Sequence, residues 1–211
     1  MKAPEYHFNK IFYLLQVLII IISLSCQNKK DCSDFMNETY LDEQIDPGEM
    51  QKLLAERDTL LRRFDVKPIK GQNQAIYHLL YYSSHGFGQS IKFEKKDSSY
   101  FLTSKCLVKT GWPSECENFH MEITKSAWDD FEKMIYEFNF WTENQLEANR
   151  NVLDGFVFIL EGVRPEAEKC GKRTYQLIGR GSPQYDKIGE LCKCIINYKE
   201  QIGFHYQIYK R

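Results

Sequence analysis

The sequence has no excess of charge of either sign. Lysine and arginine together number 28 and aspartate and glutamate 29, which gives a formal net charge of −1 at pH 7. Binding to nucleic acid generally needs a strongly basic surface, and a long acidic tract would indicate a solvated tail. The sequence contains neither, and we therefore expect no nucleic-acid partner.

Proline and glycine are also scarce. The 211 residues include six prolines and 12 glycines, and no Pro-, Gly- or Ser-rich stretch divides the chain. No internal repeat or low-complexity segment is present apart from a short polar lead at residues 27–45. With aromatic residues at 14%, the chain beyond this lead, residues 46–211, is expected to form one domain with a substantial core.

The sequence lacks the motifs of common hydrolases and metalloenzymes. It has no Gly-x-Ser-x-Gly elbow, no His-Glu-x-x-His and no Cys-x-x-Cys, and the Cys-x-Cys at 192–194 has no histidine nearby. Residues 179–183 lack the lysine and the strand–loop–helix spacing of a phosphate-binding loop. We therefore expect no catalytic residue, no cofactor and no metal site.

With these motifs excluded, the histidines are the first candidates for a catalytic role. His85 follows Ser83 and Ser84 in a glycine-containing connection, whereas His78 and His120 lie in strand patterns. Adjacency in sequence does not provide the geometry of a nucleophile with its base. A hydrogen-bonding role is therefore favoured for His85.

Two carboxylates lie near an apolar run at residues 156–163. Asp154 and Glu161 would be more than ~20 Å apart in an extended chain at about 3.3 Å per residue, and on opposite faces. This separation excludes them as the carboxylate pair of a glycosidase. Asp154 is interpreted as a turn residue, and Glu161 is expected to face solvent or to pair with Arg173 or Arg180.

The one long hydrophobic run lies near the N-terminus. Residues 11–22 are apolar except for Gln16, follow a lysine-containing start, and lead through small residues to Cys26. As a helix, the run would cover about 18 Å at about 1.5 Å per residue, short of the ~30 Å hydrocarbon core of a bilayer. The layout is typical of a secretory signal peptide, residues 1–25, that is removed from the mature protein.

Cys26, preceded by Ser23-Leu24-Ser25, resembles the lipobox of bacterial lipoproteins, and the polar residues 27–31 are similar to those of Bacteroidota lipoproteins. The resemblance implies that Cys26 carries acyl chains such as palmitate and that residues 26–45 are a lipid-proximal linker. It also implies attachment to a membrane of the cell envelope, most simply the outer membrane, on its periplasmic side or at the cell surface. Two alternatives are an ordinary signal peptide and an uncleaved N-terminal anchor.

Assigning Cys26 to lipid leaves six of the seven cysteines. An even number in an exported protein favours disulfides. Cys106 and Cys116 flank a turn between two expected strands, so a bridge between them is our first choice. Cys170 paired with Cys192 or Cys194 is the second. The last two are two residues apart on an expected helix and therefore point to different sides.

The remaining pattern predicts an α+β fold. Helices are expected from Asp46 to before Pro68, at 126–141 and at 185–198, from their caps and from apolar residues at helical spacing. Strand signals lie at 76–82, 91–94, 100–108, 119–123, 156–163, 175–178 and 204–209. Because strands and helices do not alternate regularly, we expect an antiparallel sheet of about five to six strands with two to three helices packed on one face.

These observations favour a non-enzymatic envelope lipoprotein with a binding, assembly or structural role. An immunity or inhibitor protein against a secreted toxin is a second hypothesis, and it implies a protein partner. A hydrolase acting on envelope polymers is the third, and it would need a cleft in which histidine and acidic side chains converge. The sequence does not specify an oligomeric state.

Overall fold

The computed structural model describes Cys32 and residues 46–83, 86–107, 117–143, 156–181 and 186–210. Its elements are α2 (Pro47–Arg63), β1 (Ile76–Ser83), β2 (Gly88–Lys96), β3 (Ser99–Leu107), β4 (Phe119–Ile123), α3 (Lys125–Glu137), β5 (Phe156–Val163), the 3-10 helix η2 (Pro165–Cys170), β6 (Tyr175–Gly181) and α4 (Lys187–Lys210). The expected α+β fold is confirmed, with six strands in one antiparallel sheet and three longer helices packed on it.

The six strands follow the order β4-β3-β2-β1-β5-β6. The first four form a meander, and β5 returns to pair with β1 rather than with β4. In the β2–β3 hairpin Lys96 lies opposite Ser99, and Asp97 takes a positive φ of 54° in the turn. Aspartate tolerates this left-handed conformation better than most residues do, which explains why the turn forms at this place.

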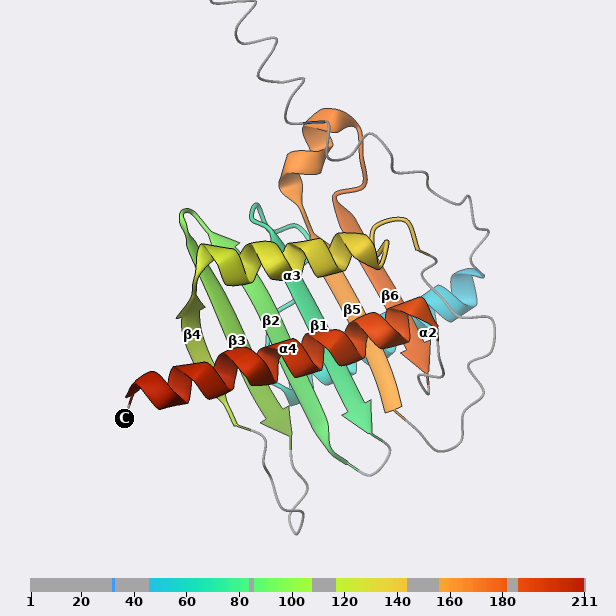
Figure 1. Ribbon diagram of the computed structural model, residues 1–211. Coiled ribbons are helices and arrows are strands. Elements are labelled where there is room, and N and C mark those ends of the chain that lie inside the picture. The colour runs from blue at the N-terminus through green and yellow to red at the C-terminus, as the bar shows by residue number, and fades with distance from the viewer. Residues whose placement is uncertain are drawn as a thin grey trace, which may run out of the picture.

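Helices cover both faces of the sheet. In Figure 1, α3 and α4 cross in front of the strands and α2 lies behind them. Alternate residues of β1 serve the two sides: Tyr77 and Leu79 belong to the core under α3 and α4, and Leu80 packs with α2. The expectation of helices on one face only was therefore wrong, because the central strands carry apolar side chains on both faces and both must be covered.

The α2 side is held by a small apolar cluster. Leu53, Leu60, Leu61 and Phe64 from the helix and the residue after it pack against Leu80, Ile159 and Leu177 of the sheet. Asp46 caps the helix as expected, accepting a hydrogen bond of 2.8 Å from the backbone nitrogen of Gly48, and Pro47 begins the first turn. The buried members from the sheet belong to β1, β5 and β6, and the partly buried Leu107 at the end of β3 packs against them. The side chains of β2 and β3 farther from this end face the connection that follows α2.

The α3 and α4 side contains the larger core, which is rich in aromatic rings. Phe93 and Phe131 stack with their ring centroids 3.8 Å apart, and Tyr77 contacts Phe131, Phe140 and Trp141. All five side chains are at most 1% exposed. Each fully buried ring of this size stabilises the fold by about 1.5–3 kcal/mol relative to an exposed one.

The expected strand at residues 204–209 is wrong. α4 continues through this segment to Lys210, because no proline interrupts the helix that begins at Lys187. At the other end of the helix, β6 extends to Gly181, so residues 179–181 belong to a strand instead of a loop. The rest of the 179–183 segment, including Pro183, lies outside the described residues.

Cys170 forms a disulfide with Cys32 across a sequence separation of 138 residues. The expected pairing with Cys192 or Cys194 is therefore wrong, and both of these thiols are free. Cys192 is buried in the core beneath α4, where burial raises the pKa of its thiol. Cys170 is the last residue of η2, which projects beyond the sheet between β5 and β6 (Figure 1). Cys192 lies in the core, too far away to form a disulfide with Cys170.

Cys106 at the end of β3 is also disulfide-bonded. Cys116 lies outside the described residues, so its pairing with Cys106 stays a prediction. Residues 1–31, which include the expected signal peptide and Cys26, also lie outside them. Within the described ranges, no helix is long and apolar enough to cross a bilayer.

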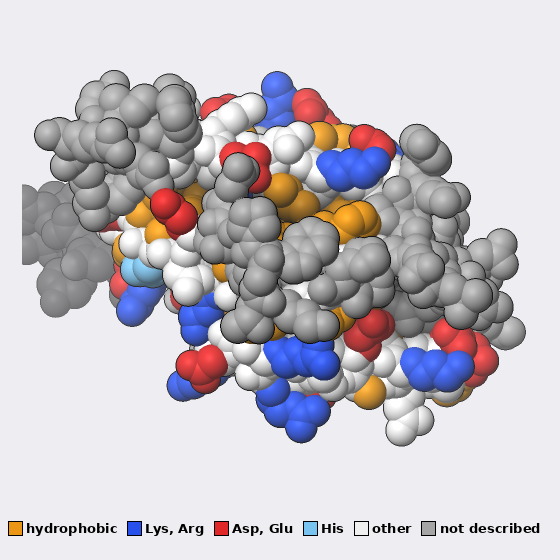
Figure 2. Space-filling model, turned by 90° about the horizontal axis from the view of Figure 1, so that it is seen from below, with side chains coloured by type: hydrophobic (Ala, Val, Ile, Leu, Met, Phe, Trp, Pro, Cys, Tyr) orange, Lys and Arg blue, Asp and Glu red, His pale blue; other side chains and the backbone are white. Residues whose placement is uncertain are grey.

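The described surface carries charges of both signs. Figure 2 shows lysine, arginine, aspartate and glutamate side chains interspersed on the side of the molecule seen from below, with hydrophobic side chains visible between them. This mixture agrees with the small net charge of the sequence.

Candidate functional site

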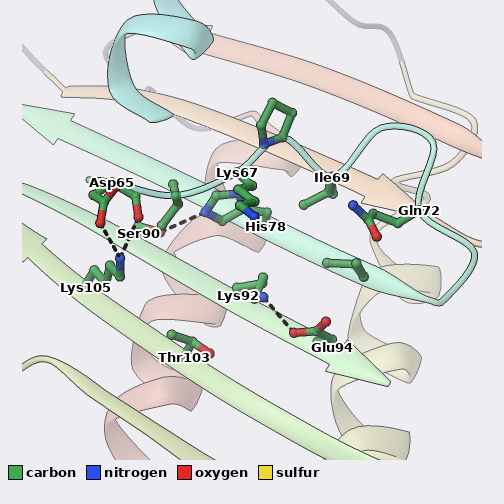
Figure 3. A pocket seen from close by; sticks show the side chains of 13 residues that line it. Asp65, Lys67, Ile69, Gln72, His78, Ser90, Lys92, Glu94, Thr103 and Lys105 are labelled. Atoms are coloured by element: carbon green, nitrogen blue, oxygen red, sulfur yellow. Dashed lines mark hydrogen bonds and ion pairs between the residues drawn. The ribbon is translucent and has the colours of Figure 1, made fainter. Parts of the chain in front are cut away.

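A pocket of about 470 Å³ opens on the α2 side of the sheet. Its wall is the connection from α2 to β1, residues 65–72, and its floor is formed by side chains of β1, β2 and β3, as Figure 3 shows. The size falls in the range of about 300–1,000 Å³ that is usual for small-molecule sites.

His78 and Ser90 meet on the floor of this pocket. In the antiparallel pairing of β1 with β2, His78 lies opposite Lys92 and Ser90 opposite Leu80, which makes Ser90 a diagonal neighbour of His78 on the same face. The Nε2 atom of His78 and the Oγ atom of Ser90 are 2.8 Å apart and point toward each other in Figure 3. Both residues line the pocket although His78 is only 1% exposed and Ser90 only 3%.

Glu161 lies on the other side of the same imidazole. It is directly opposite His78 in the pairing of β1 with β5, and its Oε1 atom is 3.4 Å from Nδ1 of His78. Both atoms are buried, neither has a hydrogen-bond partner among the described residues, and the attraction of the carboxylate acts on Nδ1 across this 3.4 Å separation. The carboxylate therefore favours the tautomer with hydrogen on Nδ1, which leaves Nε2 free to accept a hydrogen bond from the Ser90 hydroxyl.

The second oxygen of Glu161 is held from the α2 side. The hydroxyl of Tyr175 on β6 donates to Oε2 over 3.1 Å, and Nη1 of Arg57 on α2 lies 3.8 Å from the same oxygen. Arg57 also donates to the Tyr175 hydroxyl over 3.1 Å and pairs with Asp58 at 2.6 Å. Because Glu161 is 0% exposed, its carboxylate oxygens need such partners in place of water.

These contacts join Ser90, His78, Glu161, Tyr175 and Arg57 into one chain, which we call the buried relay. Burial, followed by the charge of Glu161, raises the pKa of Tyr175 above its ordinary value, so its phenol stays protonated and donates. For Arg57, burial opposes the charge, but hydrogen bonding to Asp58 and the nearby Tyr175 and Glu161 raise its pKa overall. The relay therefore carries a positive group at one end and a hydroxyl facing the pocket at the other.

Charged side chains line the pocket above the relay. The ammonium of Lys92 lies 2.6 Å from Oε2 of Glu94. The Lys105 ammonium donates to the backbone oxygens of Phe64 and Asp65 over 3.2 and 2.6 Å, and thereby ties β3 to the end of α2. The lining combines hydrogen-bond donors with a mixed charge, which suits a small polar ligand better than an apolar one.

The structure places the other candidate residues outside the buried relay, although His120 contacts a residue that lines the pocket. His120 lies on β4, where its Nδ1 is 2.8 Å from the Thr103 hydroxyl. Neither expected arginine partner pairs with Glu161: Arg180 pairs with Asp186, and Arg173 donates to Gln176 over 2.6 Å. The expectation for Glu161 was therefore wrong in both forms, since its strand is covered by α2 and the guanidinium comes from Arg57. His85 and Asp154 lie outside the described residues.

Sequence reasoning missed the convergence of His78, Ser90 and Glu161. One local signal exists, because His78 and Glu161 each interrupt an otherwise apolar strand. A polar side chain in a strand that is buried on both faces needs a partner in the neighbouring strand. This rule predicts a contact between His78 and Glu161 once β5 is known to lie beside β1. The sequence alone does not show that these two strands are neighbours.

Comparisons with known proteins assign the chain to no family. No family model matches it, and neither curated proteins nor solved structures gave a match. The described part of the chain contains no group of three or more histidine, cysteine, aspartate or glutamate residues placed to hold a metal ion.

Proposed function

We propose that this protein is a lipid-anchored component of the bacterial cell envelope that binds a small polar ligand in the pocket beside α2. The observation that carries the proposal is the buried relay under the pocket. Burying a carboxylate and a guanidinium is more expensive than filling the same space with apolar side chains. Ionisable groups retained beside a cavity at such a cost are typical of binding and active sites.

The lining indicates the chemistry of the ligand. Thr103, Lys92 and Lys105 offer donors, and Ser90 presents a hydroxyl at the floor. Donors converging on one cavity suit an oxygen acceptor, and we propose an acyl compound with a carbonyl group. Glu94 and Asp65 offset the lysine charges, so a neutral acyl compound fits better than a multiply charged anion.

Two observations support the envelope address. The N-terminal sequence resembles a lipoprotein signal that ends at Cys26. The Cys32–Cys170 disulfide suits the oxidising environment that exported proteins meet, because such bonds are rare in the cytosol. A single acyl chain gives only marginal membrane binding, so the proposal includes more than one chain on Cys26.

Ligand-observed NMR with a panel of small esters, N-acetylated amino acids and acetylated sugars tests the pocket. We expect a subset of these acyl compounds to bind the wild type and to bind Lys92→Met at least tenfold more weakly. Lys133→Met is the matched control, because Lys133 is an exposed residue of α3 on the other side of the sheet. Binding that is equal in both variants, or no binding by any member of the panel, would contradict the pocket assignment.

Cys26→Ser tests the anchor. We expect the wild type in the membrane fraction with a mass increase from acylation, and the variant in the soluble fraction without it. Unchanged fractionation and an unmodified wild-type mass would refute the lipid anchor while leaving the pocket proposal intact.

A further inference from the structure

We propose that Ser90 is a nucleophile and that this pocket cleaves carboxylic esters. The inference rests on the proposed function of the pocket and names the reaction of its ligand. It is carried by the geometry of three side chains: the Ser90 hydroxyl is 2.8 Å from Nε2 of His78, and the opposite nitrogen is 3.4 Å from a carboxylate oxygen of Glu161. A nucleophile, a base in hydrogen-bond contact and an acid behind the base form the arrangement that activates serine in hydrolases of unrelated folds.

The reaction proceeds in two balanced steps. Nε2 of His78 takes the proton as Oγ of Ser90 forms a bond to the carbonyl carbon of the ester. The bond from that carbon to the alcohol oxygen then breaks, the alcohol leaves with the proton from His78, and Ser90 carries the acyl group. Water next attacks the acyl carbon by the same proton transfers, which releases a carboxylic acid and restores the Ser90 hydroxyl.

Glu161 acts as a positioning residue in this scheme. Its carboxylate holds the imidazole in the tautomer that can accept from Ser90 and stabilises the imidazolium that forms during each step. Tyr175 donates a hydrogen bond to this carboxylate and Arg57 lies 3.8 Å from it, so both hold Glu161 in place. These supports come from β6 and α2, so the geometry of the relay depends on four strands and one helix.

The same cavity offers donors for the oxygen on which negative charge develops. Lys92 lies two residues after Ser90 on β2, so the two side chains share a face with their α-carbons ~7 Å apart. Thr103 of β3 is directly opposite Lys92 in the pairing of β2 with β3. Both residues line the pocket. The Thr103 hydroxyl contacts Nδ1 of His120, whereas the Lys92 ammonium contacts Glu94 and has further N–H groups to donate. Donors directed at the developing charge usually provide a large part of catalysis.

Ser104 shows what a purely structural serine looks like in this sheet. It is as buried as Ser90, at 1% exposure, and lies on the adjacent strand, but it accepts a hydrogen bond of 3.2 Å from the amide of Gln89 on the opposite face of the sheet. It does not line the pocket beside α2. Ser104 is therefore the matched control for an assay of Ser90.

The test is labelling with an alkyl fluorophosphonate followed by peptide mass mapping. In this reaction the serine oxygen forms a bond to phosphorus, fluoride leaves, and His78 takes the hydroxyl proton. We expect one adduct on Ser90 in the wild type and in Ser104→Ala, and none at this site in Ser90→Ala. In His78→Gln the labelling rate should fall at least ~100-fold, the usual range for a lost general base.

Glu161→Gln distinguishes a positioning role from a purely structural one, because only a positioning role predicts a change in the pH dependence of labelling. We expect slower labelling and a midpoint of the pH–rate profile displaced to lower pH, because the amide does not stabilise an imidazolium. Circular dichroism checks that each variant is folded, and Ser90→Ala, which removes one hydroxyl, decides the matter should Glu161→Gln unfold.

The proposal is overturned if folded wild type gains no adduct on Ser90, or if His78→Gln labels as fast as the wild type. Failure here is distinguishable from failure of the binding proposal. If acyl compounds bind in a Lys92-dependent manner while Ser90 stays unlabelled, the pocket remains a binding site and the nucleophile assignment falls.

Discussion

Gly162 lies near the end of β5 beneath three buried aromatic rings, and we predict that adding one methyl group there destabilises the fold. A Cβ atom at this position would lie 2.7 Å from Cε1 of Phe140, 3.1 Å from Cδ1 of Tyr77 and 3.2 Å from Cη2 of Trp141. The first of these distances is shorter than carbon atoms tolerate without movement. Gly162→Ala therefore forces the core to shift.

The rings around Gly162 have little freedom to move. Phe140 and Trp141 are 0% and 1% exposed and pack edge to face with their centroids 5.0 Å apart. The guanidinium of Arg164 lies over the Trp141 ring, 3.9 Å from its centroid, and restricts its movement. Overpacking of this kind usually costs about 1–3 kcal/mol, whereas alanine in place of glycine recovers about 0.4–1 kcal/mol through the unfolded chain. We expect a net loss of about 1–2 kcal/mol.

Gly181→Ala provides the matched control in the next strand. A Cβ atom at Gly181 would meet no described residue within 4 Å, so we expect only the gain through the unfolded chain there. Urea denaturation followed by circular dichroism should place the two variants about 2 kcal/mol apart, which is about 1 M in midpoint at a slope of ~2 kcal/mol per M. Equal midpoints with unchanged slopes would refute the packing described around Gly162.

Three further predictions concern the disulfide, the relay and one carboxyl group. Replacing both Cys32 and Cys170 by serine should lower the free energy of unfolding by about 2–5 kcal/mol, because the bridge closes a loop of 138 residues; intact stability in the double variant, or a different bridge in non-reducing peptide maps, would contradict this. Tyr175→Phe should cost about 1–3 kcal/mol in urea denaturation, since it removes the hydroxyl that donates to the buried carboxylate of Glu161; a loss below the error of the assay would show that the contact does not support the relay. Burial raises the pKa of Glu132, so the charged form is less stable in the fold than in the unfolded chain. This group stabilises the fold fully only below pH 4.5 and loses that contribution as pH rises through its folded pKa. Glu132→Gln should therefore be more stable than the wild type at pH 7 and lose this advantage below pH 4.5, and a pH-independent difference would contradict the assignment.

The strand hairpins could be predicted because their signals are local. Polar and apolar residues alternate in β2, Asp97 stands at the turn, and β3 follows immediately. Alternation and turn preference act over a few residues. The same kind of signal placed the beginning of α2 at Asp46, where a carboxylate and a proline act on the first turn alone.

The expectation that helices cover one face of the sheet was wrong, although the sequence of β1 contained a signal for coverage of both faces. Ile76, Tyr77, Leu79 and Leu80 are apolar at both odd and even positions of β1, which is typical of a strand buried on both faces. Only the packing of α2 against the even positions shows that this signal was meaningful. The prediction of a strand at 204–209 was wrong for a related reason. A helix that begins at Lys187 extends by one residue more readily than a new strand begins.

The candidate site was the least accessible part of the molecule to sequence reasoning. His78 and Ser90 lie in one hairpin, but Glu161 and Tyr175 arrive from strands that follow α3, and Arg57 belongs to a helix that precedes the sheet. Sequence patterns describe the local environment of each of these residues separately and do not show which of them are in contact. The relay exists only because strand register brings their side chains to one face.

The sequence by itself determined the α+β class, most strands and the start of α2, because propensities, caps and turns are properties of short segments. It also supplied the lipoprotein resemblance at Cys26, which remains a proposal. Only the tertiary structure decided that β5 pairs with β1, that α2 packs opposite α3 and α4, and that Cys170 reaches Cys32. Such choices depend on the apolar area and polar pairing summed over residues far apart in the chain, against the entropy of closing long loops. The pocket and its relay are products of those long-range choices.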